Sequence, residues 1–162
     1  MNNFKRLPNT DTHNCFACSP KNPSGLKMSF FASDRSVFSQ VTIPQHLCGW
    51  NNLAHGGVLS TILDEVMSWT AMYLLKNIVM TRSMTVEFLK PVYIGQRLKA
   101  EGRVLEVKGQ HKAVLEAFIY DPEEEICAKA KGNFAVFSSR IAQRMGIMDS
   151  ASIKWFESVI NT

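Results

Sequence analysis

A single long apolar segment restricts the fold of this chain more than any other feature. The stretch from Asn51 to Leu75, NNLAHGGVLSTILDEVMSWTAMYLL, predicts a helix that is entered through His55, Gly56 and Gly57. Its apolar residues cover most of the helical circumference, whereas a surface helix shows one apolar stripe. We therefore expect other elements to wrap around this helix.

The segments on either side of the helix have the length and alternation of β-strands. Leu26 to Ala32 and Val37 to Ile43 predict a hairpin with its turn at Ser33 to Ser36, and a short helical tail is predicted from about Ser139. Four more strands are predicted between the helix and the tail, in the segments MTRSMTVEFLKPV, GQRLKAEGRVLEVKG, QHKAVLEAFIYD and EEICAKAKGNFAVFSS. Short turns favour an antiparallel sheet, which must bury one face, and the helix is the only sizeable cover. The predicted class is α+β.

Composition and charge limit the classes of function. A chain of 162 residues with 46% hydrophobic content can bury a core, so residues 1–162 predict one globular domain. The net charge of +4 comes from scattered Lys and Arg, which argues against a nucleic-acid partner but leaves anionic small ligands open. No signal peptide is recognisable, and Asp64 and Glu65 interrupt the apolar segment. We expect a cytoplasmic protein without a membrane span.

Four cysteines are expected to be reduced thiols rather than a disulfide framework. Only Cys15 and Cys18 form a CxxC motif, and His13 beside them would complete half of a zinc site. No second CxxC or His pair follows, so small buried thiols in a turn are the preferred interpretation. No metal or other cofactor is therefore expected.

Polar side chains form one stripe along the predicted helix. At 100° per residue the stripe occupies an arc of about 140° and consists of Ser60, Thr61, Asp64, Glu65 and Ser68. Such a stripe faces water, a partner or a functional site.

The start of the helix favours the last of these possibilities. Gly56 and Gly57 leave the first backbone N–H groups uncovered by side chains, and the helix dipole favours negative charge there. These groups suit a carbonyl oxygen that becomes negative during a reaction, as in an oxyanion hole. His55 alone is a weaker signal, because a histidine at a tight turn more often bonds the backbone.

The pattern of His55-Gly56-Gly57 followed after six residues by Asp64 resembles the hotdog-fold acyl-CoA thioesterases of the PaaI-like, phenylacetate-pathway type. The helix lies between a strand hairpin and an antiparallel run whose first strand ends in FLKPV, and the resemblance extends roughly from Cys15 to Phe137. The segment CFACSPKNPSGLKMSFF is similar to a leader found in one branch, although Ser19 stands where Gly is more common.

The resemblance implies a hotdog fold, in which the sheet wraps the helix. Residues 1–25 would form a turn-rich leader and residues 138–162 a helical tail. It also implies hydrolysis of acyl-CoA thioesters by paired subunits, in a dimer or a dimer of dimers, with the CoA thioester as substrate and no cofactor. A non-catalytic acyl-CoA binding protein of the same fold is the alternative, whereas the Asp and His pair of hotdog hydratases is missing.

The resemblance also assigns roles to single residues. It implies that the Gly57 N–H polarises the thioester carbonyl and that Asp64 is the nucleophile or general base. It implies that His55 shapes the turn and that Thr81 positions the attacking water. Many relatives carry Asn or Gln six residues before the His, where this chain has Gly49.

Several neighbouring residues complete the candidate site. Substrate contacts are expected from Gly56 and Ser68, and from Asn51 or Asn52 as substitutes for the missing upstream amide. Ser68 could instead bond the helix backbone. Glu65 is the rival acid, although a solvated or interface charge is the preferred interpretation.

The substrate pocket is less well determined by the sequence. The large apolar residues Trp50, Trp69, Met72 and Phe88 are expected in the core rather than at an acyl pocket. Solvated surface is expected for the basic residues that could otherwise meet CoA phosphates, namely Arg82, Lys90, Arg103, Lys112, Arg140 and Arg144.

Helix geometry predicts the oligomeric state independently of the resemblance. Asp64 follows Gly57 by seven residues, which separates them by about 10 Å along the axis. A nucleophile must lie about 3 Å from the carbonyl carbon that the helix start binds. We therefore expect a homodimer in which each site combines Gly57 of one chain with Asp64 of its partner.

Overall fold

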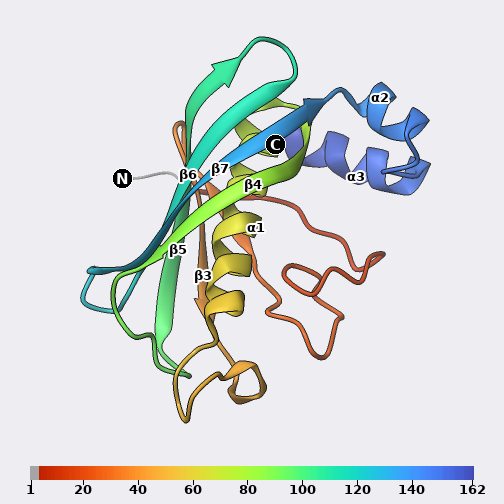
Figure 1. Cartoon of the computed structure of the whole chain (residues 1–162). Helices are drawn as coiled ribbons and strands as arrows, with labels where there is room; N and C mark the ends of the chain where they lie inside the picture. Colours follow the sequence, from red (N-terminus) through yellow and green to blue (C-terminus); the bar gives the residue numbers. More distant parts are fainter. Residues whose placement is uncertain (1–3) are drawn as a thin grey trace.

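The computed structural model describes residues 4–162 as one antiparallel sheet wrapped around a central helix (Figure 1). The strand order is β1-β2-β3-β5-β6-β7-β4. The strands are β1 (Lys5–Arg6), β2 (Phe30–Ala32), β3 (Val37–Thr42), β4 (Ile78–Phe88), β5 (Arg97–Lys108), β6 (Lys112–Tyr120) and β7 (Ile126–Phe137). The helices are α1 (Gly56–Leu75), α2 (Ser139–Arg144) and α3 (Ser150–Ile160), with a 3-10 turn η1 (Gln45–Leu47). The predicted α+β architecture is confirmed.

Helix α1 fills the concave side of the sheet, as its apolar circumference predicted. Trp69 is 1% exposed and its ring stacks on Phe30 at a centroid distance of 4.3 Å. On β5, a Cβ at Gly102 would lie 2.4 Å from Thr70 Oγ1, so only glycine permits this close approach of strand and helix. Within residues 4–162, no helix is both long enough and apolar enough to cross a membrane.

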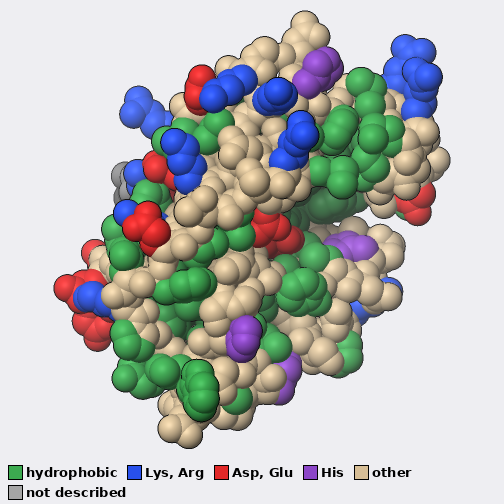
Figure 2. Space-filling model, viewed as in Figure 1, with side chains coloured by type: hydrophobic (Ala, Val, Ile, Leu, Met, Phe, Trp, Pro, Cys, Tyr) green, Lys and Arg blue, Asp and Glu red, His purple; other side chains and the backbone are tan. Residues whose placement is uncertain are grey.

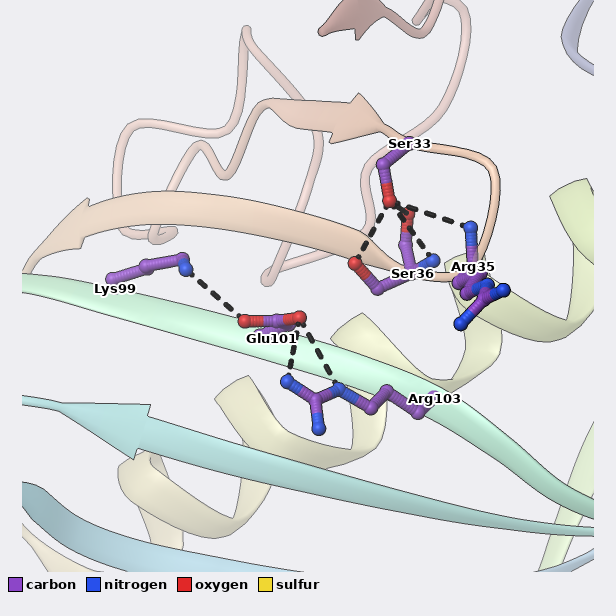
Figure 3. Close-up of polar contacts among 6 residues, drawn as sticks. All are labelled: Ser33, Arg35, Ser36, Lys99, Glu101 and Arg103. Atoms are coloured by element: carbon purple, nitrogen blue, oxygen red, sulfur yellow. Dashed lines mark hydrogen bonds and ion pairs between the residues drawn. The ribbon is translucent and has the colours of Figure 1, made fainter. Parts of the chain in front are cut away.

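The outer face of the sheet carries charged side chains that face solvent. Figure 3 shows Glu101 of β5 between Lys99 and Arg103, with N–O distances of 3.0 and 3.1 Å. These three residues alternate with buried inward residues, as expected for a strand with one covered face. In the same view the Ser33 hydroxyl contacts the Ser36 hydroxyl at 3.1 Å and closes the predicted hairpin turn.

The leader changes the boundary of the first predicted strand. Strand β2 begins at Phe30 and not at Leu26, because Lys27 has a positive φ of 52° that interrupts the extended chain. The Leu26 N–H instead donates to the Phe16 carbonyl at 2.8 Å. The leader, predicted to be turn-rich, also contains the short strand β1, which pairs with β2.

The other boundaries differ at strand and helix ends. Strand β4 begins at Ile78, two residues earlier than predicted, and ends at Phe88 before the predicted end at Val92. Pro91 lies in between, and proline cannot donate to a sheet ladder. Helix α1 ends at Leu75, where Lys76 adopts a left-handed conformation.

The C-terminal helices and the leader cover the side of α1 that the sheet leaves open (Figure 1). The predicted helical tail is present as α2 and α3. The ring of Trp155 on α3 meets Trp69 of α1 edge to face at 5.5 Å. Its indole N–H donates to the Pro8 carbonyl at 3.2 Å. Leader, tail and central helix therefore form one packed unit.

Candidate active site

The start of α1 is capped by its own histidine. His55 is the N-cap residue, and the Gly57 N–H donates to His55 Nδ1 at 2.9 Å. This bond requires an unprotonated Nδ1, so the neutral imidazole carries its proton on Nε2. The expectation that no side chain covers the Gly57 N–H is wrong for this residue, because a helix start satisfies its N–H groups locally. The Gly56 N–H, by contrast, has no acceptor among the described residues.

This cap makes a stability prediction. His55→Ala is expected to lower the free energy of unfolding by about 1 kcal/mol, because the Gly57 N–H loses its acceptor. Urea denaturation followed by circular dichroism measures this loss. His55→Asn is the matched control, since an Asn side chain also caps helices. Equal losses in both variants would show that the packing of the ring matters and the cap does not.

The residues upstream of His55 place no side-chain amide in a hydrogen bond with it within residues 4–162. Gly49 lies beside the histidine, since a Cβ at this position would be 3.3 Å from His55 Cα. The position therefore faces the helix start but offers no polar group. Asn51 has a positive φ of 44° in an exposed turn, and neither Asn51 nor Asn52 forms a side-chain hydrogen bond with another described residue.

A pocket of about 290 Å³ opens between the helix start and the end of β4. We call it the helix-start pocket; it is lined by Leu53, Ala54, Gly56, Leu59, Phe88, Leu89, Lys90, Pro91 and Val92. A Cβ at Gly56 would lie 3.4 Å from the Phe88 ring, so glycine keeps this wall open.

The core assignment was wrong for two of the large apolar residues. Phe88 is 54% exposed, because it ends an edge strand, and Trp50 is 85% exposed in the turn before α1. Trp69 is in the core as expected, and Met72 packs against it in a partly buried position.

Asp64 has a hydrogen-bond partner on the neighbouring edge strand. Thr81 Oγ1 donates to Asp64 Oδ1 at 2.6 Å, from β4 to the middle of α1. The pairing of β4 with β7 shifts register between Thr81 and Ser83, so Arg82 forms a bulge beside this contact. Bulges of this kind re-aim side chains and occur often next to active sites. Thr81 was expected to position a water, and the structure places its hydroxyl directly on the carboxylate.

The remaining members of the polar stripe point elsewhere. The hydroxyls of Ser60 and Thr61 donate to the helix carbonyls of Gly56 and Gly57, both at 2.9 Å. Ser68 lines a cavity on the leader side of α1 and has no side-chain hydrogen bond among the described residues. The predicted stripe is thus divided, and among its members within residues 4–162 only Asp64 forms a side-chain hydrogen bond with β4.

Glu65 packs against the leader and is not the freely solvated charge that was one of the interpretations preferred from the sequence. Its Oε1 accepts a hydrogen bond from Trp69 Nε1 at 3.1 Å and lies 3.9 Å from Cys15 Sγ. Burial, and next the neighbouring Cys15 sulfur, raise the pKa of Glu65 to about 7. Two adjacent acids therefore occupy different environments.

The candidate basic residues are divided between several faces. Lys90 lines the helix-start pocket and forms an ion pair with Glu125. Arg82 is exposed at the bulge beside Thr81, whereas Arg103 is paired with Glu101 on the outer sheet face. Figure 2 shows Lys and Arg side chains gathered over the upper half of one face of the molecule. Among these basic residues, Lys90 borders the helix-start pocket and Arg82 directly follows Thr81.

Comparison with known proteins agrees with this architecture. Residues 51–128, which contain α1 and most of the following strands, match the model of the thioesterase superfamily. The chain has the hotdog fold, and its residues 51–128 are similar to the thioesterase superfamily. The resemblance read from His55-Gly56-Gly57 and Asp64 is thereby confirmed at the level of the superfamily. No curated protein is significantly similar to the chain.

Three solved structures share the hotdog fold of this chain. RHA08564, a thioesterase superfamily protein, has 23% identity and a TM-score of 0.68, over 74% of this chain and 58% of that protein. The chain thus spans less than two thirds of RHA08564. The E. coli PaaI protein of the phenylacetic acid degradation operon has 19% identity and a TM-score of 0.63, over 70% and 81%. A hypothetical thioesterase of Streptococcus pneumoniae TIGR4, solved with coenzyme A, has 21% identity and a TM-score of 0.60, over 65% and 83%.

Proposed function

We propose that this hotdog protein hydrolyses acyl-CoA thioesters and belongs to the PaaI-like branch. The observation that carries the proposal is the Asp64 carboxylate, held by the Thr81 hydroxyl at 2.6 Å between α1 and the edge strand β4. A thioester is already activated, so an oriented carboxylate and an oxyanion donor suffice for its hydrolysis. Asp64 then acts as nucleophile or as the general base for a water. The superfamily match and the CoA-bound streptococcal neighbour support this substrate class.

The helix start supplies the oxyanion donors in this proposal. The Gly57 N–H is the principal donor. When a thioester carbonyl binds, this N–H either donates to both the carbonyl oxygen and His55 Nδ1 or leaves His55 for the carbonyl oxygen. The Gly56 N–H and the Nε2–H of neutral His55 lie at the same helix start and provide further positive groups. The apolar walls of the helix-start pocket, including Phe88, would exclude water from the carbonyl.

A second copy of the chain brings the two halves together in this proposal. Asp64 and Gly57 lie on one continuous helix and remain about 10 Å apart along its axis. Strand β4 ends the sheet and pairs only with β7 within the described chain, and most of its residues are exposed. A long free edge of this kind favours pairing with another strand.

Antiparallel pairing of two β4 strands about a two-fold axis would make this contact isologous. Suppose that this pairing is centred on Ser83, the midpoint of β4. The half of one strand that contains Thr81 then lies opposite the half of the other strand that ends at Phe88. Asp64 of one chain then approaches the helix-start pocket of the other, as the helix geometry predicted.

A substrate panel tests the proposed activity. Short-, medium- and long-chain and aryl acyl-CoAs are incubated with the protein, and hydrolysis is followed by the loss of thioester absorbance. Absorbance is preferable to a thiol reagent because the protein has four free cysteines. We expect catalytic turnover of at least one class. Tight binding without turnover would instead identify a non-catalytic acyl-CoA binding protein.

The Asp64–Thr81 hydrogen bond makes a separate prediction. Thr81→Val is expected to lower kcat about tenfold to hundredfold, because a hydrogen bond to the charged carboxylate is lost. Thr81→Ser keeps the hydroxyl and should retain most of the activity. Steady-state kinetics on the best acyl-CoA measure both variants. Equal losses in the two variants would indicate that the threonine methyl group, and not the hydrogen bond, is required.

A further inference from the structure

A second cluster of reactive side chains lies on the side of α1 away from Asp64. Cys15 and Cys18 of the leader and Glu65 of α1 place their ligand atoms within 4.8 Å of one another. We call these three residues the thiol-carboxylate cluster. We propose that it binds one thiophilic divalent cation, with Zn²⁺ as the best match, and thereby fastens the leader to the central helix.

The residue types and their local geometry suit such an ion. Two cysteine sulfurs and a carboxylate oxygen are ordinary ligands of Zn²⁺, and thiolates select zinc over magnesium or calcium. The CxxC segment is already folded as a tight turn, since the Ser19 N–H donates to the Cys15 carbonyl at 3.0 Å. The sulfurs therefore face Glu65 without rearrangement of the leader.

The charges of the cluster also favour a cation. Hydrogen bonds from the Cys18 thiol and from the backbone N–H groups of Cys18 and Ala17 lower the pKa of Cys15 to about 5. Its thiolate in turn raises the pKa of Cys18, by accepting that hydrogen bond. No Lys or Arg of residues 4–162 forms an ion pair with Glu65. Three acidic groups thus share a partly buried position, and a bound cation would compensate their negative charge.

The cluster borders a cavity of about 240 Å³ between the leader, α1 and α3. Figure 2 shows the surface hollowed at this place, between the C-terminal helices and the leader. Zn²⁺ prefers four ligands in a tetrahedral arrangement. With three protein ligands, the fourth position falls to a water in this cavity. Ion binding deprotonates the Cys18 thiol and releases that proton to solvent.

Cobalt titration of the full chain tests the proposal. The reduced, chelator-stripped protein is titrated with Co²⁺, and Zn²⁺ is then used to displace it. We expect one Co²⁺ per chain, with a thiolate charge-transfer band and the visible bands of a tetrahedral ion. Cys15→Ser, Cys18→Ser and Glu65→Gln should each weaken Zn²⁺ binding about 100-fold or more. The matched controls are Cys48→Ser, a half-buried thiol elsewhere, and Asp64→Asn, the adjacent acid; both should bind as the wild type does.

Two further measurements do not depend on the folding of the variants. Zn²⁺ at a hundredfold excess over its Kd should raise the Tm of the wild type by about 5–10 °C. It should also slow alkylation of Cys15 while leaving the rate at Cys48 unchanged. The proposal is overturned if reduced protein shows no charge-transfer band, or if binding survives loss of both leader cysteines. A Cys15–Cys18 disulfide that forms in preference to metal binding would overturn it as well.

Discussion

Asp64→Asn is expected to lower kcat for acyl-CoA hydrolysis by about 10²- to 10⁴-fold, with little change in KM. The substitution keeps an oxygen that accepts the Thr81 hydrogen bond. It removes the negative charge with which Asp64 attacks the thioester or deprotonates a water. Fold and substrate binding should therefore survive, while the chemical step does not. Loss of thioester absorbance, measured over a range of acyl-CoA concentrations, separates the two parameters.

Glu65→Gln is the matched control for this experiment. It removes the neighbouring carboxylate on the same helix, which contacts Trp69 and Cys15 rather than β4. Its kcat should stay within a few-fold of the wild-type value. If Glu65→Gln is inactive and Asp64→Asn is not, the assignment of the catalytic acid is reversed. If both variants cleave thioesters normally, the carboxylate mechanism is wrong.

Mixed dimers of two inactive variants are expected to regain activity. One chain carries Asp64→Asn and the other carries Gly57→Val, whose Cβ would lie 3.0 Å from His55 Nδ1 and disturb the helix start. A shared site uses Gly57 of one chain and Asp64 of the other, so each heterodimer contains one intact site. An equal mixture that reassociates at random should reach about a quarter of the wild-type rate.

The alternative arrangement makes the opposite prediction. If Gly57 and Asp64 of the same chain formed each site, every site in the mixture would carry a defect and no activity would return. Each variant dissociated and reassociated with itself is the control for the exchange procedure. Sedimentation or mass measurement of differently tagged chains confirms that heterodimers have formed.

The main features of the fold were predictable from local patterns. The segment ending at Leu75 predicted a wrapped helix, because apolar residues cover most of its circumference and leave only a narrow polar stripe. Alternating strands joined by short turns predicted the antiparallel sheet around it. The spacing of Gly57 and Asp64 follows from helix rise alone, so their separation could be derived before any tertiary contact was known.

The candidate site was predictable in its residues but not in its contacts. Asp64 and Thr81 were both named from the sequence, yet the 2.6 Å hydrogen bond between them, beside the β4 bulge at Arg82, is a long-range contact that the sequence did not predict. A backbone hydrogen bond was the preferred interpretation of His55, but its partner, the Gly57 N–H, was not predicted, because ring orientation is a local conformational choice. The exposure of Trp50 was mispredicted, since apolar character alone does not say which residues the sheet covers.

The two acids in the middle of α1 show where prediction from the sequence ends and the effect of tertiary packing begins. Periodicities, spacings and residue types are properties of the chain, so the sequence sufficed for a buried helix with a polar stripe. The resemblance favoured Asp64 over Glu65 as the catalytic acid, but it could not predict their surroundings, because residues 100° apart on a helix differ in environment only through what packs on each side. Strand β4 lies on one side and the leader on the other, and both are remote in sequence. Long-range packing therefore assigned one acid to the proposed hydrolytic site and placed the other beside two cysteines.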